Sequence, residues 1–377
     1  MSTKASRRSF NFFEFFVIFS IPFLFLVQEV YSFAAILIIL LIYACVNFED
    51  CFSINVLLIA GLFTVSFIPV LLISQHNYSH FFYYLMTISC LLAARGVSRA
   101  GVVRLFPIFQ ALFWFFVLFS LLVYYYYRDL AEPFSGLVKG SSTNGIPSYL
   151  IVIQVVYSLS FYCVKRHLPI VSVLFTLLVA ILGIGRGSIY IALVILLISL
   201  FLNFFIDVKR RRYGWIVLYL LVLLSGVLLL IANIELLVDY LNAKTKALQG
   251  LSDPYREQIL LEYLSSIKWW QVYLGGRYDG SVVETLYNGN PHIAFIRSHA
   301  YLGVFYTILV LLSPLYFVFF SRVAFSSGVF FLFSSILLVR ALSEPILFPT
   351  ALDFFYFLLF FLYYQSFYSK NYLVGSR

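Results

Sequence analysis

Arginine and histidine side chains gather in one polar stretch of this chain, residues 233–298. The stretch contains Arg256, Arg277, His292 and Arg297. A guanidinium group offers N–H donors in a planar fork that matches phosphate oxygens. An imidazole has an ordinary pKa of about 6.5 and can take a proton from a hydroxyl group. These residue types predict anion binding together with general-base chemistry, and Arg277 and His292 are the catalytic candidates.

A glycine-rich segment adds another arginine to the candidate set. Residues 183–188 read GIGRGS. Glycine lets the backbone approach a ligand closely, and Ser188 can cap a following helix whose N-terminus favours an anion. Arg186 adds donors suited to phosphate oxygens. The alternative interpretation is a tight turn from which Arg186 snorkels to the membrane surface.

Three further candidates have alternatives of their own. Arg340 is predicted to contact an anion, although it can instead pair with Glu344 four residues later. His299 competes with His292 for the role of base. Arg256 opposes the dipole of the helix predicted to begin at Pro254, which favours a functional role, but a solvated charge beside the neighbouring glutamate is the simpler alternative.

The polar stretch is predicted to contain short helices separated by loops. An amphipathic helix over 234–248 would lie on a membrane surface. A second helix is predicted over 254–270, because Asp253 and Pro254 are good helix-start residues. Its apolar side chains are Ile259, Leu260, Tyr263, Leu264 and Ile267. Turn-rich segments then place Arg277 and His292 on loops, where binding and chemistry are often located.

The rest of the chain reads as lipid-soluble helix. Of its 377 residues, 63% are hydrophobic and 11% are charged, with a mean hydropathy of +0.98. A soluble domain could not bury so much apolar surface, whereas a membrane helix needs roughly 20 apolar residues. The apolar stretches are 10–27, 30–46, 52–74, 79–94, 105–127, 147–164, 169–184, 188–206, 213–232, 299–320, 323–340 and 349–367.

These stretches predict an all-α polytopic membrane protein with about 12 transmembrane helices. Residues 1–232 hold spans one to nine, 233–298 form one long extramembrane loop with short helices, and 299–377 hold spans ten to twelve. Fifteen of the 25 Lys and Arg residues fall on the side that carries the N-terminus. The positive-inside rule therefore predicts that both termini are cytoplasmic and that the loop is outside.

Composition also limits partners and cofactors. The net charge of +9 follows from topology, and no basic soluble domain is present to hold nucleic acid. The cysteines, at 45, 51, 90 and 163, predict neither a disulfide framework nor a zinc site. The 43 Phe and 29 Tyr are typical of interfacial belts, and the lipid bilayer is the first expected partner. No metal or cofactor is expected.

At motif level the chain resembles the O-antigen polymerase (Wzy) family of bacterial polysaccharide polymerases, which is related to O-antigen ligases. The resemblance covers roughly residues 170–320. It is carried by the late long loop, by Arg186-Gly187 opening a helix before it, and by Pro291-His292 eleven residues before Gly303. The resemblance implies a GT-C-like membrane fold in the bacterial inner membrane, with the loop in the periplasm.

The resemblance further implies a metal-independent glycosyltransferase. Its donor and acceptor would be undecaprenyl-pyrophosphate-linked oligosaccharides, and a chain-length regulator protein would be a partner. On this interpretation His292 and Arg277 are catalytic, Arg186, Arg256, Arg297 and Arg340 bind pyrophosphate, and His299, Glu344 and Ser188 support them. A pyrophosphate leaving group develops negative charge in the transition state, which fixed arginines would stabilise.

Other functions remain open at this stage. A ligase would join finished polymer to a lipid A–core acceptor. A lipid-linked oligosaccharide flippase, or another transporter, would tend to show related halves and charges buried within the membrane. Acidic residues within the predicted spans are few, namely Glu14 and Asp353. An accessory or scaffold role is a further alternative.

Overall fold

The fold is given by a computed structural model of the whole chain. It describes residues 12–73, 77–137, 144–212, 254–276, 278, 281–287, 289–319 and 324–367, with the single positions 214, 217, 232 and 235. Every regular element in these ranges is a helix, and none is a strand. The predicted all-α class is therefore confirmed for the described part of the chain. Predicted span nine and the predicted helix over 234–248 lie outside it.

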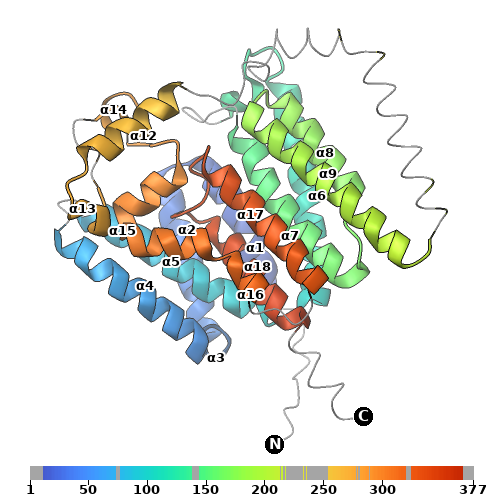
Figure 1. Cartoon of the computed structure of the whole chain (residues 1–377), viewed down its shortest axis with the longest axis horizontal. Coiled ribbons are helices and arrows are strands. Elements are labelled where there is room, and N and C mark those ends of the chain that lie inside the picture. Colours follow the sequence, from blue (N-terminus) through green and yellow to red (C-terminus); the bar gives the residue numbers. More distant parts are fainter. Residues whose placement is uncertain are drawn as a thin grey trace, which may run out of the picture. The chain divides into compact units, whose positions relative to one another are not determined.

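The chain separates into two compact units, residues 1–112 with 259–377 and residues 113–258. Helices before the division are α1 (Phe12–Val27), α2 (Val30–Val46), α3 (Phe48–Cys51), α4 (Ile54–Ile73) and α5 (Asn77–Ser98), with α6 (Val102–Tyr126) crossing it. The later helices of the same unit are α13 (Gln271–Leu274), α14 (Val282–Thr285), α15 (Ala294–Leu312), α16 (Leu315–Phe319), α17 (Ala324–Ala341) and α18 (Asp353–Phe367), preceded by α12 (Pro254–Ser266), which crosses back (Figure 1).

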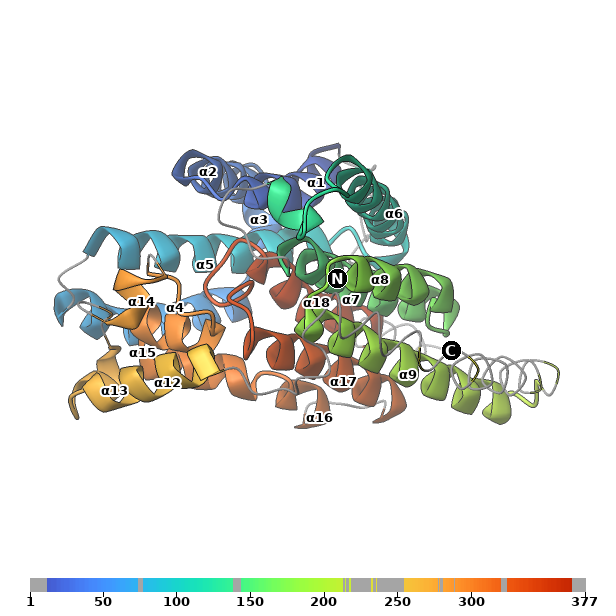
Figure 2. The same ribbon diagram turned by 90° about the horizontal axis from the view of Figure 1, so that it is seen from above.

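Helix α5 organises the first unit. It packs along α18, and α2, α3, α4 and α15 also contact it. In Figure 2, a view turned by 90° from that of Figure 1, α4 and α5 run beside each other. Helix α18 is buried along almost its whole length, including Phe354, Phe355 and Leu358. Segments from the two ends of the sequence therefore share one core.

The second unit is a packed group of helices around α7 (Gly145–Lys165). Helices α8 (Ile170–Leu182) and α9 (Arg186–Lys209) contact α7 and each other, and the short helix η1 (Pro133–Gly136) contacts α7. Some of their buried polar groups bond to one another: the Thr176 hydroxyl donates to the side-chain carbonyl of Gln154 at 3.0 Å. Pairing of this kind is needed where water is excluded.

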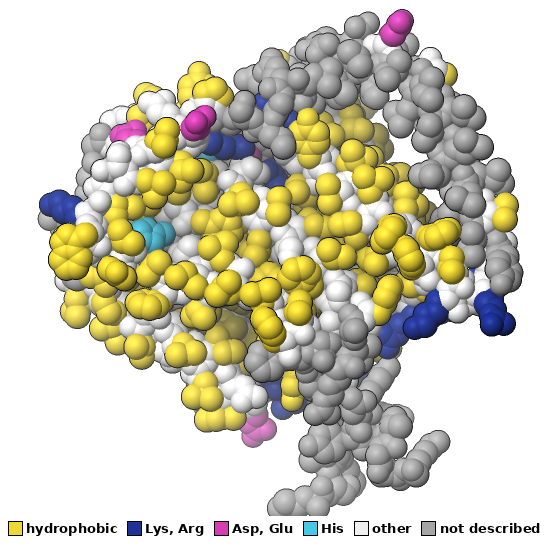
Figure 3. Space-filling view, in the orientation of Figure 1, with side chains coloured by type: hydrophobic (Ala, Val, Ile, Leu, Met, Phe, Trp, Pro, Cys, Tyr) yellow, Lys and Arg dark blue, Asp and Glu magenta, His cyan; other side chains and the backbone are white. Residues whose placement is uncertain are grey.

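Within the described ranges, six helices are long and apolar enough to cross a membrane. They are Ile54–Leu72, Tyr78–Ser98, Val102–Tyr126, Gly145–Lys165, Arg186–Lys209 and Ala294–Leu312. Four shorter apolar helices accompany them, at Phe12–Val27, Val30–Val46, Ile170–Leu182 and Phe325–Ala341. Figure 3 shows hydrophobic side chains spread widely over the described surface, as lipid-facing helices require. These features fit a multi-pass membrane protein, and the number of twelve spans stays a prediction.

Two predicted helix boundaries are wrong. The helix that starts at Pro254 ends at Ser266, not at 270, because the backbone N–H of Lys268 donates to the Gln271 side chain and α13 begins there. The predicted span 299–320 is two helices, α15 and α16, separated at Ser313-Pro314. Proline lacks the N–H that a continuous helix would use.

Candidate functional site

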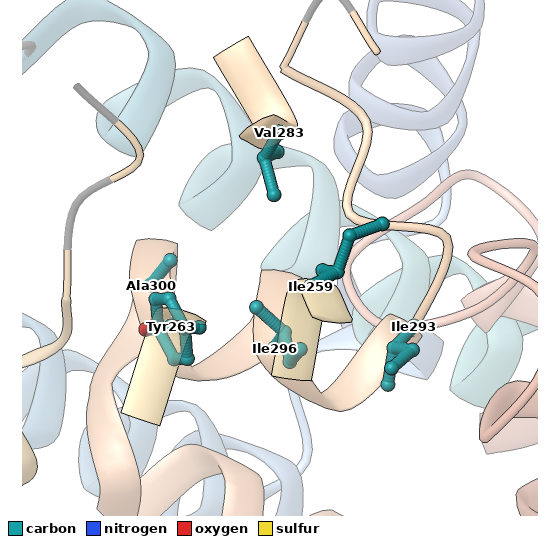
Figure 4. Close-up of a cluster of buried hydrophobic side chains, with 6 residues drawn as sticks. All are labelled: Ile259, Tyr263, Val283, Ile293, Ile296 and Ala300. Atoms are coloured by element: carbon teal, nitrogen blue, oxygen red, sulfur yellow. The ribbon is translucent and has the colours of Figure 1, made fainter. Parts of the chain in front are cut away.

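A small hydrophobic cluster holds α12 and α14 against α15. Ile259 and Tyr263 come from α12, Val283 from α14, and Ile293, Ile296 and Ala300 from α15 and the residue before it. Figure 4 shows these side chains converging between the helices. The four-residue spacing of Ile259 and Tyr263 puts both on one face of α12. The cluster thereby fixes the position of the polar residues that surround it.

Tyr263 and His299 form a closed hydrogen-bond network beside this cluster. The Nε2 atom of His299 lies 2.8 Å from the Val272 carbonyl oxygen, which can only accept a proton. Nε2 therefore carries the hydrogen, and neutral Nδ1 accepts from the Tyr263 hydroxyl at 2.7 Å. The same hydroxyl accepts from the Gly276 backbone N–H at 3.1 Å. Both ring nitrogens are occupied, so His299 is a structural histidine in this arrangement.

Two glycines allow this close approach. At Gly275, φ is +101°, and an added Cβ would lie 2.5 Å from the carbonyl oxygen of His299. At Gly303, φ is +80°, which kinks α15. Other L-residues rarely adopt such angles. The 271–276 segment is therefore seated on α15, and His299 lies inside that helix, not at the start of a span.

Arg297 holds the connection between α17 and α18, residues 342–352. One terminal nitrogen of its guanidinium donates to the Pro345 carbonyl, and also to the Leu347 carbonyl at 3.1 Å. Asp353 supports the same connection by accepting the backbone N–H groups of Phe348 and Thr350 at 2.8 and 3.0 Å. These bonds satisfy backbone groups of a connection that is largely buried. They also fix the guanidinium in one orientation.

Beside these bonds, two polar atoms are left open. The Nε atom of Arg297 and the hydroxyl of Tyr278 are both buried and have no hydrogen-bond partner among the described residues. They are close enough to interact electrostatically: burial raises the pKa of Tyr278 well above its ordinary value, and the Arg297 charge opposes this shift. The hydroxyl therefore stays protonated at physiological pH. The Arg297 Nε can only donate and the protonated Tyr278 hydroxyl can also donate, which suits an anionic oxygen.

Aromatic rings surround the open pair. The ring of Tyr278 lies 6.1 Å from that of Tyr301, centroid to centroid, and Tyr301 in turn lies 4.6 Å from Tyr83 and 4.9 Å from His80. His80 and Tyr83 belong to α5, and Tyr301 belongs to α15, all in the first unit. An aromatic wall of this kind lowers the local dielectric, so a charge–charge contact with Arg297 would be stronger than in water.

His292 lies on the loop before α15, as its sequence predicts. Its backbone is in the left-handed region, with φ of 54°, and its N–H donates to the Asn290 side chain at 3.1 Å. Its ring packs edge-on against Tyr287, with centroids 4.9 Å apart. This hydrogen bond to the Asn290 side chain explains how a non-glycine residue holds the left-handed conformation. The imidazole is only partly buried.

Arg340 and Glu344 are brought together at the end of α17. Arg340 is fully buried, donates to the Ser343 hydroxyl at 2.7 Å and lies 3.7 Å from a carboxylate oxygen of Glu344. The pairing alternative from the sequence is therefore observed. A buried arginine needs such a counter-charge, because the unpaired ion would be costly.

The other candidates lie in the second unit or outside the described residues. Arg186 is the first residue of α9 and Arg256 is in the first turn of α12; both are partly buried. Ser188 does not cap α9. The cap residue is Gly185, and the buried Ser188 hydroxyl lies 3.4 Å from the Asn144 side chain, inside the helix packing. Arg277 lies outside the described residues, so its role stays a prediction.

The sequence does not predict the roles of two tyrosines. It places Tyr263 only on an apolar helix face and indicates no role for Tyr278. A tyrosine directly after the Gly-Gly-Arg turn is a signal for a hydroxyl near a loop, but nothing in the sequence says which partner it lacks. Asp353 was noted only as an acid within a span, whereas its carboxylate holds a turn.

No group of three or more His, Cys, Asp or Glu side chains in the described ranges could hold a metal ion. No protein-family model matches the chain. Searches of curated proteins and of solved structures also found no match.

Proposed function

We propose that this protein is a glycosyltransferase of the bacterial inner membrane that joins undecaprenyl-pyrophosphate-linked repeat units into a polysaccharide. The observation that supports the proposal best is the open pair of Arg297 and Tyr278. The Nε atom of Arg297 and the hydroxyl of Tyr278 are buried donors without a partner in the described structure. The 342–352 connection fixes the orientation of the Arg297 guanidinium. Preorganised donors of this kind stabilise developing negative charge.

The proposed reaction displaces a pyrophosphate. The bond between the anomeric carbon of the growing chain and the pyrophosphate oxygen breaks, and an acceptor hydroxyl oxygen on the incoming unit forms the new glycosidic bond. The leaving undecaprenyl pyrophosphate gains negative charge as its bond breaks. Arg297 would bind that charge, with Arg186, Arg256 and Arg277 as the further predicted contacts. The acceptor proton passes to a base.

His292 is the better candidate for that base. In His299 both ring nitrogens are engaged, with Val272 and Tyr263, so proton uptake would break a bond that supports the fold. His292 is on a loop and its imidazole is partly exposed. Arg340 is better interpreted as a structural residue because Glu344 neutralises it.

The finer topology belongs to this proposal. Twelve spans, cytoplasmic termini and a periplasmic loop over 233–298 follow from the charge bias and from the resemblance to the O-antigen polymerase family. The partners are then the two lipid-linked oligosaccharides, the bilayer and a chain-length regulator. No cofactor is included.

Turnover by the purified protein tests the proposal. We expect the full chain in detergent or vesicles to convert lipid-linked repeat units into a polymer ladder without any ion gradient, with release of undecaprenyl pyrophosphate. Arg277→Ala and Arg186→Ala should lose the ladder at normal expression. Normal ladders from both variants would contradict the anion-site assignment. Cysteine labelling that placed position 277 in the cytoplasm would contradict the topology.

A deletion strain separates polymerase from ligase. A polymerase deletion leaves one repeat unit attached to the lipid A–core, because ligation continues. A ligase deletion leaves no attached sugar. The first result is expected here.

A further inference from the structure

A second site lies at the other end of α15. A cleft of about 610 Å³ is bounded by α4, α5, α15 and α18, all in the first unit. Its lining includes Leu309 and Val310 of α15, about three helical turns after Arg297. The volume is within the range of small-molecule sites. The cleft is therefore separate from the open pair described above.

Most of the lining is apolar and faces the lipid side. Phe63 and Phe357, at 8% and 7% exposure, form buried parts of the wall. Leu58 and Leu62, on α4, also line the cleft but are 62% and 58% exposed. The cleft thus opens sideways onto the apolar surface that a bilayer would cover. A hydrocarbon chain could enter it without crossing water.

One end of the cleft is polar and positively charged. Arg95, in the last turn of α5, and Ser53, just before α4, both line it. The Nε atom of Arg95 and the hydroxyl of Ser53 are buried without a hydrogen-bond partner among the described residues. Buried donors are normally satisfied, so each of these calls for a partner. Both are at one end because α4 and α5 run in opposite directions.

No carboxylate neutralises Arg95 in the described residues. The nearest acidic side chain on α3, Asp50, pairs instead with Arg99 at 3.7 Å, and Arg99 does not line the cleft. The Arg95 guanidinium stacks over the Phe361 ring at 5.6 Å, which holds its plane beside the apolar wall. A positive fork at the end of an apolar cleft is complementary to an anionic headgroup on a hydrocarbon chain.

We propose that this cleft binds an anionic phospholipid of the surrounding bilayer. One acyl chain lies along α4 and α18, and the phosphate accepts hydrogen bonds from Arg95 and Ser53. The positive-inside rule puts Arg95 on the cytoplasmic side, where anionic lipid headgroups attract basic residues. The inference does not depend on the proposed glycosyl transfer, and its test uses no glycosyltransferase substrate.

The test is native mass spectrometry of the full chain with two lipids that share their acyl chains. The probes are dioleoyl phosphatidylglycerol and dioleoyl phosphatidylcholine. We expect the wild type to retain the anionic lipid about tenfold better, as charge-assisted hydrogen bonds allow. Arg95→Gln should remove this preference, Arg95→Lys should keep part of it, and the control Arg99→Gln should leave it unchanged. Ile59→Trp, at the mouth of the cleft, should reduce retention of both lipids.

Five results would overturn the proposal. Equal retention of the two lipids by the wild type would show that charge is not recognised. An unchanged preference in Arg95→Gln, or an equal loss in Arg99→Gln, would place recognition elsewhere. Displacement of the lipid by excess inorganic phosphate would indicate a free-anion site. Displacement by undecaprenyl phosphate at equal concentration would identify a different occupant. Thermal unfolding of each variant checks that the fold is retained.

Discussion

Two neighbouring polar regions of the first unit differ in how completely their hydrogen bonds are made. In one, Tyr263 and His299 use every ring nitrogen and the hydroxyl on partners within the protein. In the other, Tyr278 and Arg297 keep a buried hydroxyl and a buried Nε with no such partner in the described residues. The closed region supports the fold, whereas the proposed function assigns the donors of the open region to a bound substrate.

Two arginines that the sequence grouped together differ in their counter-charge. Arg340 is fully buried and faces Glu344. One terminal nitrogen of Arg297 donates to the carbonyls of Pro345 and Leu347, and the guanidinium has other donors besides. Charge alone therefore does not mark a binding arginine: a carboxylate pairs with Arg340 at 3.7 Å, whereas none of the described carboxylates lies within ion-pair distance of Arg297. Five predictions test this comparison, from the largest expected effect to the smallest.

The largest effect is expected from removing the counter-charge of Arg340. Glu344→Ala should lower the free energy of unfolding by about 3 kcal/mol, because it leaves a buried guanidinium unpaired. Thermal unfolding in detergent measures the loss. Polymerisation per folded molecule should change little. A variant as stable as the wild type would show that Arg340 does not need Glu344.

Arg297→Gln should have the next largest effect, on activity. We expect polymerisation by folded protein to fall about 100-fold, since a fixed donor to developing charge is lost. Arg297→Lys keeps the charge and separates charge from the fork geometry. Activity is divided by the folded fraction from size-exclusion chromatography. A fall that follows the folded fraction alone would make Arg297 another structural arginine.

The comparison also shows what could be predicted from sequence. Apolar runs located the helices well: the stretch 30–46 is α2, and 188–206 lies within α9. A long apolar run is a local property, so tertiary packing changes it little. The contacts of the candidate site residues could not be predicted in this way. That Ser188 packs against Asn144, or that Gly303 kinks α15, depends on residues distant in sequence. Residue type predicted what each side chain can do, while its partner was set by packing.

The two tyrosines allow an identical chemical change in each region. Tyr263→Phe removes a hydroxyl that bridges His299 and the Gly276 N–H. The buried Gly276 N–H and the partly buried His299 ring would both lose this bond, so the free energy of unfolding should fall by about 2 kcal/mol. Thermal or denaturant unfolding measures this. Unchanged stability would mean that water replaces the hydroxyl and that the network is not closed.

The Tyr263 network also predicts a response to alkaline pH. Burial raises the pKa of Tyr263 above its ordinary value of about 10. The folded state therefore holds the proton more tightly than the unfolded chain does. The stability this contributes is complete below pH of about 10 and is lost as the pH rises further. Tyr263→Phe should lose less stability than the wild type between neutral and strongly alkaline pH.

Tyr278→Phe is expected to give the smallest effect on the fold and so is the sharpest test. Its hydroxyl has no partner in the described structure, so its removal breaks no hydrogen bond and spares the cost of burying a polar group. Stability should stay within about 0.5 kcal/mol of the wild type or rise slightly. If the hydroxyl donates to substrate, polymerisation should still fall about tenfold, a loss of about 1.4 kcal/mol in transition-state binding. Loss of activity without loss of stability is a result that a structural tyrosine cannot give. Unchanged activity would instead remove Tyr278 from the site and leave Arg297 as its only described donor.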